Sequence, residues 1–289
     1  MKLRQLWLGL TAAALLLCAG CATSTGGATN ASDSSDPSFE VKVTPAIQEI
    51  LDRGYLTVAC KDDVPDFGYY NEETETYEGG EIDLAYYIAA KLFDVSYDEA
   101  MENELVQFQP VETSDRENVL IDGDVDYVIA TYTITEERAE QVDFSDSYYS
   151  SAIGLMINKT ATDQGSLREA RIRSVTDLDG KTIGVISGST TRDDFVHYLQ
   201  RNCISIAPKF SEYPTYAALD KALAQGSIDV FSVDVTILNG YLTNSRKILS
   251  DRFAAQKYGV AAQKGREGLI EAANAVIDEL EYNEIVLFP

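Results

Sequence analysis

Basic residues, histidine and cysteine are all scarce in this sequence. Its 289 residues include 23 Lys and Arg against 47 Asp and Glu, which gives a formal net charge of −24 at pH 7. Because nucleic-acid binding needs basic patches, this balance argues against a nucleic-acid partner. The single histidine is His197, and beyond the N-terminal CAGC the remaining cysteines, Cys60 and Cys203, form no CxxC motif. A metal site of His and Cys ligands is therefore not expected, and we predict no metal and no cofactor.

A hydrophobic run long enough to cross a membrane is also missing. The longest apolar stretch, Leu6–Leu17, follows a short basic region and is too short to span a bilayer. We interpret residues 1–20 as a signal peptide. Small residues precede Cys21 in CAGC, which resembles a bacterial lipobox, although Cys18 stands where leucine is usual. Cys21 is predicted to be the acylated N-terminus of the mature chain, and the alternative is an ordinary secretory signal.

The next stretch, residues 21–39, has little apolar character. It is rich in Gly, Ser, Thr, Asn and Asp and shows no apolar periodicity, which predicts a flexible tether. Behind a lipid anchor, such a tether would hold the following domain at the outer face of a membrane and leave it free to reorient.

What the chain does have is apolar content and alternating helical and extended patterns. With 45% hydrophobic residues it can bury a substantial core, and the alternation predicts an α/β fold. Thr44, Pro45 and Gly54 mark the two ends of the first helix. Helices are predicted at 45–53, 81–93, 116–120, 190–200, 215–224, 235–242 and 269–281. Strands are predicted at 55–59, 105–111, 127–130, 151–157, 181–185, 204–206, 228–233 and 258–262. Crossover helices between the first strands indicate a parallel sheet.

The stretch DYVIATYTITEERAEQVDFSDSYY, residues 126–149, carries the clearest candidate site. After a buried strand it presents Thr131 and Thr133, and then it places Arg138 on a helical turn that starts near Thr135. A guanidinium beside hydroxyls and backbone N–H groups suits a carboxylate, because its planar fork matches the two oxygens. The alternative is a surface arginine on a charged helix.

Six motifs, taken in order, resemble one protein family. They are RGYLTVACKDDVPDFGYY, GGEIDLAYYIA, DGDVDYVIATYTITEERAEQVDFSDSYY, DLDGKTIGVISGST, GSIDVFSVD and QKYGVAA. Over residues 44–288 the chain resembles the bacterial extracellular solute-binding proteins of family 3, which serve polar amino-acid ABC importers. ACKDDVP, VIATYTITEER, KFSEYP, DVFSVDVTILNGY and QKYG resemble the branch that binds aspartate and glutamate. Two departures are Gly80, where the family usually has an aromatic or aliphatic residue, and the ending YNEIVLFP, which lacks the usual terminal aromatic segment.

The resemblance implies an α/β fold of the periplasmic-binding-protein-like type II. Two α/β lobes would be joined by two hinge strands, with the ligand in the cleft between them. Lobe I is expected at 40–149 plus 258–289, and lobe II at 153–254. Because Cys60 and Cys203 would then lie in different lobes, we expect two buried free thiols rather than the disulfide that an exported protein permits.

The resemblance also implies a site for the main-chain end of an amino acid. Arg138, with Thr133 and the backbone near Thr131, would bind the α-carboxylate. From the other lobe Ser189 and Thr190 open a helix whose N–H groups favour anions, and the alternative for both is plain N-capping. A single carboxylate, Asp234 at the end of an apolar strand, would bind the α-ammonium, and the alternative there is also an N-cap without a ligand role.

A dicarboxylic ligand needs a second anion site, because a buried unpaired carboxylate is costly. Lys61 and Arg116 resemble the cationic contacts of the acidic-amino-acid branch. Read alone, each is a solvated surface charge. Tyr258 is expected to wall the pocket.

The predicted function is therefore that of a substrate-binding lipoprotein of an ABC importer for polar amino acids, with aspartate or glutamate favoured. It would be a monomer on the outer face of the bacterial cell membrane, and it would deliver its ligand to a permease and its ATPase. The alternatives are an enzyme on the same scaffold, resembling cyclohexadienyl or arogenate dehydratases, or an amino-acid sensor or adhesin. No catalytic groups assemble in the sequence, and His197 lies in the middle of a predicted helix.

Overall fold

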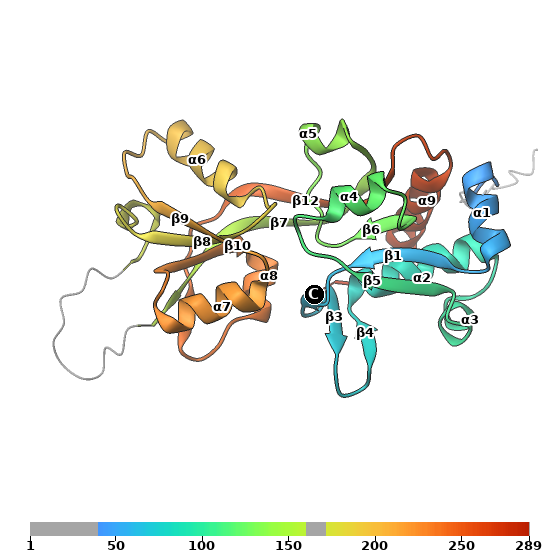
Figure 1. Cartoon of the computed structure of the whole chain (residues 1–289), viewed down its shortest axis with the longest axis horizontal. Helices are drawn as coiled ribbons and strands as arrows, with labels where there is room; N and C mark the ends of the chain where they lie inside the picture. The colour runs from blue at the N-terminus through green and yellow to red at the C-terminus, as the bar shows by residue number, and fades with distance from the viewer. Residues whose placement is uncertain (1–39, 160–171, 289) are drawn as a thin grey trace, which may run out of the picture. The chain divides into compact units, whose positions relative to one another are not determined.

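The structure, a computed structural model, describes residues 40–159 and 172–288 of the chain (Figure 1). The expected signal peptide, the tether and Cys21 lie outside these residues. Within them, no helix has the length and apolar character that crossing a membrane requires.

The helices begin and end where the sequence places capping residues. Thr44 accepts a hydrogen bond from the N–H of Ile47 (3.3 Å), and Gly54 ends the first helix in the left-handed conformation, with φ +89°. Thr215 and Gly226 bound another helix in the same way. In the described residues the α-helices are α1 Pro45–Arg53, α2 Gly80–Phe93, α3 Tyr97–Glu102, α4 Arg116–Ile121, α5 Glu136–Ala139, α6 Thr191–Arg201, α7 Tyr216–Gln225, α8 Val235–Gly240 and α9 Leu269–Tyr282.

The strands agree with the predicted apolar runs in most places. They are β1 Leu56–Cys60, β2 Asp63–Val64, β3 Gly68–Asn71, β4 Thr76–Glu78, β5 Val106–Pro110, β6 Tyr127–Ile129, β7 Val142–Asn158, β8 Thr182–Ile186, β9 Lys209–Tyr213, β10 Val230–Asp234, β11 Arg246–Ile248 and β12 Phe253–Gln263. The strand predicted at 204–206 is wrong, because β9 pairs with β8 through residues 209–213 instead. The short β2–β3–β4 sheet and α3 were not predicted.

One mixed sheet runs through the described chain in the order β5–β1–β6–β12–β7–β10–β8–β9. The parallel prediction is confirmed for β1 with β5 and β6, and β8 also runs parallel to β9 and β10. The long strands β7 and β12 are antiparallel to each other and pair from Val142↔Gln263 to Ile153↔Phe253. They join the two groups of parallel strands, as the hinge strands of a two-lobed binding-protein fold do. The lobe boundaries predicted near 149–153 and 254–258 fall inside these strands and stay a prediction.

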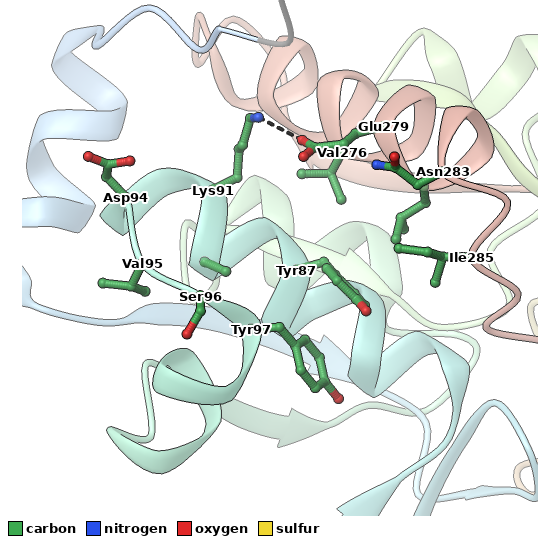
Figure 2. Close-up of a pocket in the computed structure, with 12 residues that line it drawn as sticks. Tyr87, Lys91, Asp94, Val95, Ser96, Tyr97, Val276, Glu279, Asn283 and Ile285 are labelled. Atoms are coloured by element: carbon green, nitrogen blue, oxygen red, sulfur yellow. Dashed lines mark hydrogen bonds and ion pairs between the residues drawn. The ribbon is translucent and has the colours of Figure 1, made fainter.

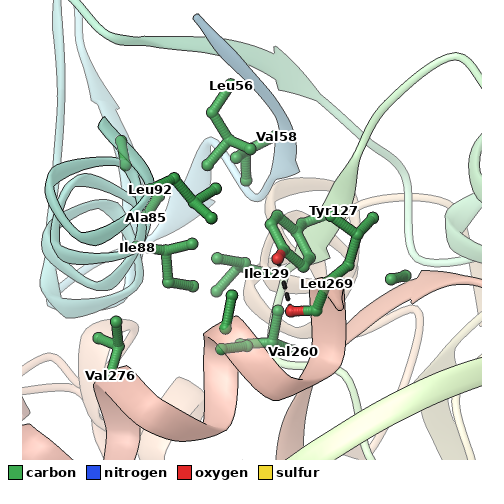
Figure 3. Close-up of a cluster of buried hydrophobic side chains, with 14 of the residues drawn as sticks. Leu56, Val58, Ala85, Ile88, Leu92, Tyr127, Ile129, Val260, Leu269 and Val276 are labelled. Atoms are coloured by element: carbon green, nitrogen blue, oxygen red, sulfur yellow. Dashed lines mark hydrogen bonds between the residues drawn. The ribbon is translucent and has the colours of Figure 1, made fainter. Parts of the chain in front are cut away.

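Helices cover both faces of the parallel strands. On β8 and β10, α6 packs on one face and α7 on the other (Figure 1). Against β1 and β6, α2 and α9 bury a core that includes Leu56, Ile88 and Val260 (Figure 3). Tyr127 belongs to this core, and its hydroxyl donates a hydrogen bond to the carbonyl of Leu269 (2.6 Å), so its polar end is satisfied inside the apolar cluster.

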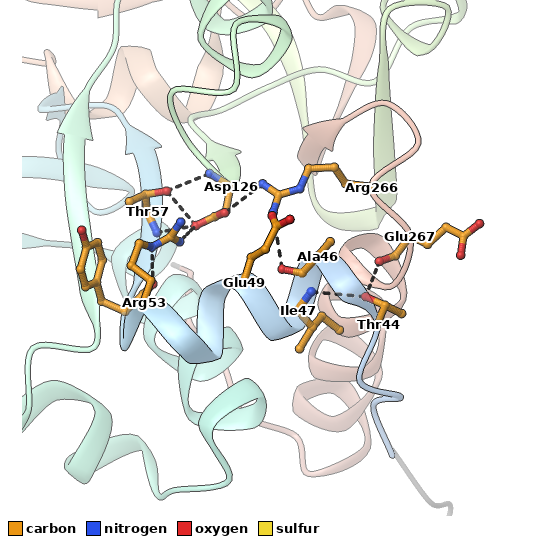
Figure 4. A network of polar contacts seen from close by, with 10 residues as sticks. Thr44, Ala46, Ile47, Glu49, Arg53, Thr57, Asp126, Arg266 and Glu267 are labelled. Carbon is orange, nitrogen blue, oxygen red and sulfur yellow. Dashed lines mark hydrogen bonds and ion pairs between the residues drawn. The ribbon is translucent and has the colours of Figure 1, made fainter.

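A buried carboxylate, that of Asp126, connects α1 to the sheet. Asp126, with a side chain only 1% exposed, accepts hydrogen bonds from the backbone N–H of Thr57 (2.9 Å) and from its hydroxyl (2.7 Å). It also pairs with Arg53 of α1 and with Arg266 (3.1 Å) after β12 (Figure 4). This network explains the acidic residue before β6 as a structural group rather than a ligand contact.

The cysteines and the last residues differ from expectation. Cys60 and Cys203 are both free, but only Cys60 is buried and Cys203 is exposed. Cys203 follows α6 with φ +53°, in a turn at the surface, so the expectation of two buried thiols is wrong for it. Phe288, in the ending YNEIVLFP, packs against the rings of Phe67 and Tyr148.

Candidate functional site

The candidate site lies where three strands end. β1 and β6 end at Cys60 and Ile129, and β10 ends at Asp234; ligands of open α/β sheets bind beyond the carboxyl ends of such strands. A small cavity lies there, lined by Thr113, Arg116, Thr131, Thr133, Arg138, Ser189, Thr190, Thr191, Tyr216, Val233, Asp234 and Gln256. It therefore gathers residues from both groups of parallel strands.

Arg138 reaches the cavity from α5. The hydroxyl of Thr135 caps this short helix by accepting from the N–H of Arg138 (3.2 Å), which fixes the position of the residue. Its guanidinium donates to the carbonyl oxygens of Thr133 (2.8 Å) and Gly188 (2.9 Å) and pairs with Glu117 (3.3 Å). Only 9% of Arg138 is exposed, so the alternative of a surface arginine is wrong.

Arg116 opens α4 and is 3% exposed, so it is not a solvated surface charge. Its guanidinium donates to the carbonyl oxygens of Thr113 (2.9 Å), Ala130 (3.1 Å) and Thr131 (3.1 Å). None of the ion pairs among the described residues includes Arg116. The site therefore holds a buried cation whose hydrogen bonds go to neutral carbonyl groups.

The two guanidiniums lie near each other. Each is positioned over the ring of Tyr132, at 4.5 Å for Arg116 and 4.8 Å for Arg138, which favours the cations through the ring quadrupole. Burial, and next the charge of Arg116, lower the pKa of Arg138 to about 10. Arg138 therefore remains charged at neutral pH, and with two guanidiniums side by side this part of the cavity attracts an anion.

Asp234 supplies the opposite charge. It is 7% exposed and accepts a hydrogen bond from the hydroxyl of Tyr258. Burial raises its pKa to about 6, against the opposing effects of the Tyr258 hydrogen bond and the charge of Arg116. Its side chain makes no capping bond to α8, so the alternative of an N-cap does not describe it. Tyr258 itself does not line the cavity but orients Asp234.

Gln256 of β12 links residues from both sides of the cavity. Its side-chain oxygen accepts from the hydroxyls of Thr133 (2.8 Å) and Thr190 (3.0 Å), and its amide group donates to Asp194 (3.0 Å). Thr190 therefore bonds Gln256 rather than capping α6, while Ser189 donates to the carbonyl of Ile186 (2.7 Å). No ligand role was predicted for Gln256 from the sequence; the available signal was an amide within an apolar strand.

Thr131 is held in a strained backbone conformation. Its φ is +45°, which is uncommon for a β-branched residue. Its N–H donates to Glu81 (2.6 Å). This N–H is therefore already used within the protein, although the backbone near Thr131 was predicted to bind the ligand. Its own hydroxyl is buried and has no hydrogen-bond partner in the described structure. A buried unpaired hydroxyl is costly, and a polar ligand in the cavity would satisfy it.

Lys61 lies beside the cavity rather than in its wall. It is 3% exposed, pairs with Asp63 (3.2 Å) and donates to the carbonyl of Val111 (3.0 Å). Its ammonium group also lies 5.5 Å from the ring centre of Tyr216, which does line the cavity. The charge of Lys61 is therefore close to the site but already shared with a carboxylate.

Seven of the nine predicted ligand residues line one cavity, and Lys61 and Tyr258 stand behind it. Thr113, Thr191, Tyr216, Val233 and Gln256 also line it and were not predicted. The cavity volume is about 20 Å³, enough for a water molecule but not for an amino acid. The side chains of the site therefore contact one another across the space that a ligand would take.

A larger hollow of about 330 Å³ lies between α2 and α9 (Figure 2). The ion pair of Lys91 with Glu279 (2.6 Å) crosses it, and Tyr87 stacks on Tyr97 at its edge (4.5 Å between ring centres). It brings together none of the predicted residues. Across the described chain no cluster of three or more His, Cys, Asp or Glu is arranged to hold a metal, and His197 is exposed on α6.

Comparison with known proteins gives relatives over most of the chain. A family model, bacterial extracellular solute-binding proteins, family 3, matches residues 56–286. A glutamine-binding protein of Geobacillus stearothermophilus is 30% identical over 268 residues, 90% of this chain and 93% of that protein. The glutamate-binding protein GluB of Corynebacterium efficiens is 26% identical over 239 residues, 80% of this chain and 75% of that one. The solved structure of an ancestral arginine-binding protein bound to arginine matches with TM-score 0.66 and 30% identity, covering 80% of this chain and 94% of that chain.

Proposed function

Because the chain belongs to family 3 of the bacterial extracellular solute-binding proteins and binds an amino acid for ABC transport, we propose that its ligand is aspartate or glutamate. The protein captures this ligand outside the cell and delivers it to a membrane permease and its ATPase. Cys21 anchors it to the membrane through lipid, and it acts as a monomer.

The observation that carries this proposal is that Arg116 is buried and forms no ion pair among the described residues. A buried guanidinium without a carboxylate partner is costly, and a ligand carboxylate beside it would recover that energy. Arg138 stands close by with a fork that suits a second carboxylate. Two buried arginines at one cavity fit two carboxylates better than they fit one carboxylate and a neutral amide.

From the positions of Arg138, Asp234 and Arg116 we infer the orientation of the ligand. Arg138, with Thr133, binds the α-carboxylate, and Asp234 binds the α-ammonium across the cavity. Arg116 binds the side-chain carboxylate, with Lys61 contributing its charge from behind Tyr216. On binding, the carbonyl oxygens of Thr133 and Gly188 give up their bonds to Arg138. Ser189, Thr190 and the hydroxyl of Thr131 complete the polar lining.

Glutamine is the second candidate, and one contact favours it. Asp63 already pairs with Lys61 (3.2 Å), which leaves less positive charge for a second carboxylate. Relatives named for glutamine and for glutamate are both found at comparable identity. We do not favour an enzyme on this scaffold, because the carboxylate that lines the cavity, Asp234, is assigned to the ligand's ammonium group rather than to proton transfer.

A thermal-shift screen of the twenty amino acids tests the proposal, because ligand binding raises the unfolding temperature by mass action. L-aspartate or L-glutamate should stabilise the native chain most. Arg116→Gln should weaken binding of L-glutamate by about tenfold or more while changing L-glutamine binding less. Arg192→Ala, which removes a 56% exposed arginine, is the matched control. Stabilisation by glutamine or arginine alone would refute the acidic ligand, and turnover of prephenate or arogenate would restore the enzyme alternative.

A further inference from the structure

The segment Ile285–Phe288 lies beside the hinge strands β7 and β12. Together with Tyr148, Tyr149 and Lys257 it lines a mostly apolar hollow of about 570 Å³. The ring of Phe288 is embedded among other rings. It stacks on Phe67 (5.0 Å, 28°) and on Tyr148 (5.5 Å, 25°), and it lies 5.3 Å from Tyr149.

Gly80, the first residue of α2, makes room for this ring. A Cβ at Gly80 would lie 2.4 Å from the carbonyl oxygen of Leu287 and 2.6 Å from two ring carbons of Phe288. Gly80 is not among the described glycines with positive φ, so its backbone would accept a side chain. The segment that ends in Phe288 therefore takes the volume that a side chain at residue 80 would fill.

Two short paths connect Phe288 to the cavity. In the first, Tyr148 donates from its hydroxyl to Glu81 (2.5 Å), which also accepts from the N–H of Thr131 (2.6 Å). Thr131 lines the cavity with φ +45°. Tyr148, which stacks on Phe288, therefore holds the carboxylate of Glu81 in place. Glu81 in turn fixes the strained backbone of Thr131.

The second path runs through Tyr258. Tyr149 stacks on Tyr258 (5.8 Å, 26°), Phe67 contacts it edge-on (6.2 Å, 86°), and both rings also contact Phe288. Tyr258 in turn donates its hydroxyl hydrogen to Asp234. Tyr149 and Tyr258 face each other in the β7–β12 ladder, whose register shifts directly after Tyr258, so the aromatic cluster sits at an irregular point of the hinge.

We propose that Phe288 is a positioning residue for ligand binding: its ring fills the space above Gly80 and holds Tyr148 and Tyr258 in the orientations that place Thr131 and Asp234. This inference rests on the proposed function, since it assigns how that same site is kept in shape. It adds a residue that does not line the cavity to the determinants of affinity.

Calorimetric titration of the full chain with L-glutamate and L-glutamine tests it. Phe288→Ala should raise the dissociation constant by about tenfold, because several ring contacts are lost at once. Phe288→Leu, which retains an apolar group of similar size, should recover most of that loss. Val286→Ala is the matched control, because it removes apolar atoms from the same segment at a side chain that is 83% exposed; its affinity should equal that of the native chain.

A second-site variant separates positioning from general destabilisation. In a double variant that carries Gly80→Leu and lacks residues 287–289, both the Leu287 carbonyl and the Phe288 ring are gone from the space beside residue 80. The new side chain should fill that space and bring the dissociation constant back to within about threefold of the native value. Gly80→Leu alone should weaken binding, because Leu287 and Phe288 already occupy that space. Near-ultraviolet circular dichroism of the tyrosines without ligand should change and recover in parallel.

Two results overturn the inference. One is native affinity in Phe288→Ala, and the other is a double variant that binds no better than Phe288→Ala. Failure of the proposed function looks different, because the native chain itself would then bind neither L-aspartate nor L-glutamate.

Discussion

Arg138 donates a hydrogen bond to the carbonyl oxygen of Gly188 (2.9 Å), a residue that follows β8 in the other group of parallel strands. Gly188 has φ +74°, and a Cβ on it would lie 2.6 Å from the Cα of Ser114. The two sides of the cavity therefore meet at a glycine, with backbone against backbone and an arginine beside them. This contact explains why the cavity is small.

Gly188→Ala should weaken ligand binding by about tenfold or more, because the added methyl group keeps Ser114 and residue 188 apart when the cavity closes. Titration with L-glutamate measures the change. Gly180→Ala is a matched control: Gly180 also has positive φ (+68°), but nothing lies within 4 Å of its added Cβ. Both variants carry the backbone strain, and only Gly188→Ala should lose affinity; equal losses would contradict this account.

Arg138→Ala should abolish binding of every amino acid, because it removes the group assigned to the α-carboxylate that all of them share. Lys61→Ala should act selectively and reduce affinity for L-glutamate more than for L-glutamine. Titration of both variants with both ligands checks the assignments. If Lys61→Ala lowers affinity for both ligands equally, Lys61 does not contribute to recognition of the side chain.

Binding should weaken in mild acid through Asp234. Burial raises its pKa to about 6, and a bound ammonium favours the charged carboxylate, so protonation opposes binding below that pH. The affinity for L-glutamate should be about tenfold lower at pH 5 than at pH 7.5. Glu81→Gln should keep this dependence, whereas Asp234→Asn should bind weakly at both pH values. A native affinity that does not change between pH 5 and pH 7.5 would exclude this role.

Stability should fall as the pH rises from about 4.5 to about 7. Burial raises the pKa of Glu81 from 4.5 to about 7, against the opposing hydrogen bonds from Tyr148 and Thr131. The folded state then binds more protons than the unfolded state in this range, so the free energy of unfolding decreases with pH. Urea unfolding at pH 5 and pH 7.5 measures the slope, and Glu81→Gln should make it smaller. Asp234 also makes the free energy of unfolding decrease with pH, in the native chain and in Glu81→Gln alike. If the slope is the same in both proteins, the pKa of Glu81 is not raised in the folded state.

Asp126→Ala should lower the free energy of unfolding by about 3–5 kcal/mol, because it leaves Arg53 and Arg266 without their buried partner. Ligand affinity should not change, since Asp126 lies in the network between α1 and the sheet (Figure 4). Glu212→Ala, which breaks the exposed pair with Arg192 (3.1 Å), should cost no more than about 1 kcal/mol. Urea unfolding of the two variants gives the comparison.

Much of this architecture follows from local sequence. Thr44, Gly54, Thr215 and Gly226 bound helices because capping depends on neighbours in the chain. Arg138 could be placed on α5 for the same reason. The strand predicted at 204–206 failed because a short apolar run carries no information about which residues meet β8; pairing settled on 209–213.

The sequence by itself determined most of the element order, the strand ends where site residues gather, and the charge types available there, since these depend on periodicity and residue chemistry. Only the tertiary structure decided which of those charges are compensated. It leaves Arg116 to carbonyl groups, pairs Lys61 with Asp63 and makes Gln256 a link between Thr133 and Thr190. It also brings Phe288 to Gly80, a contact that spans most of the chain. Such relations are long-range, and no local pattern encodes the distance between residues that folding brings together.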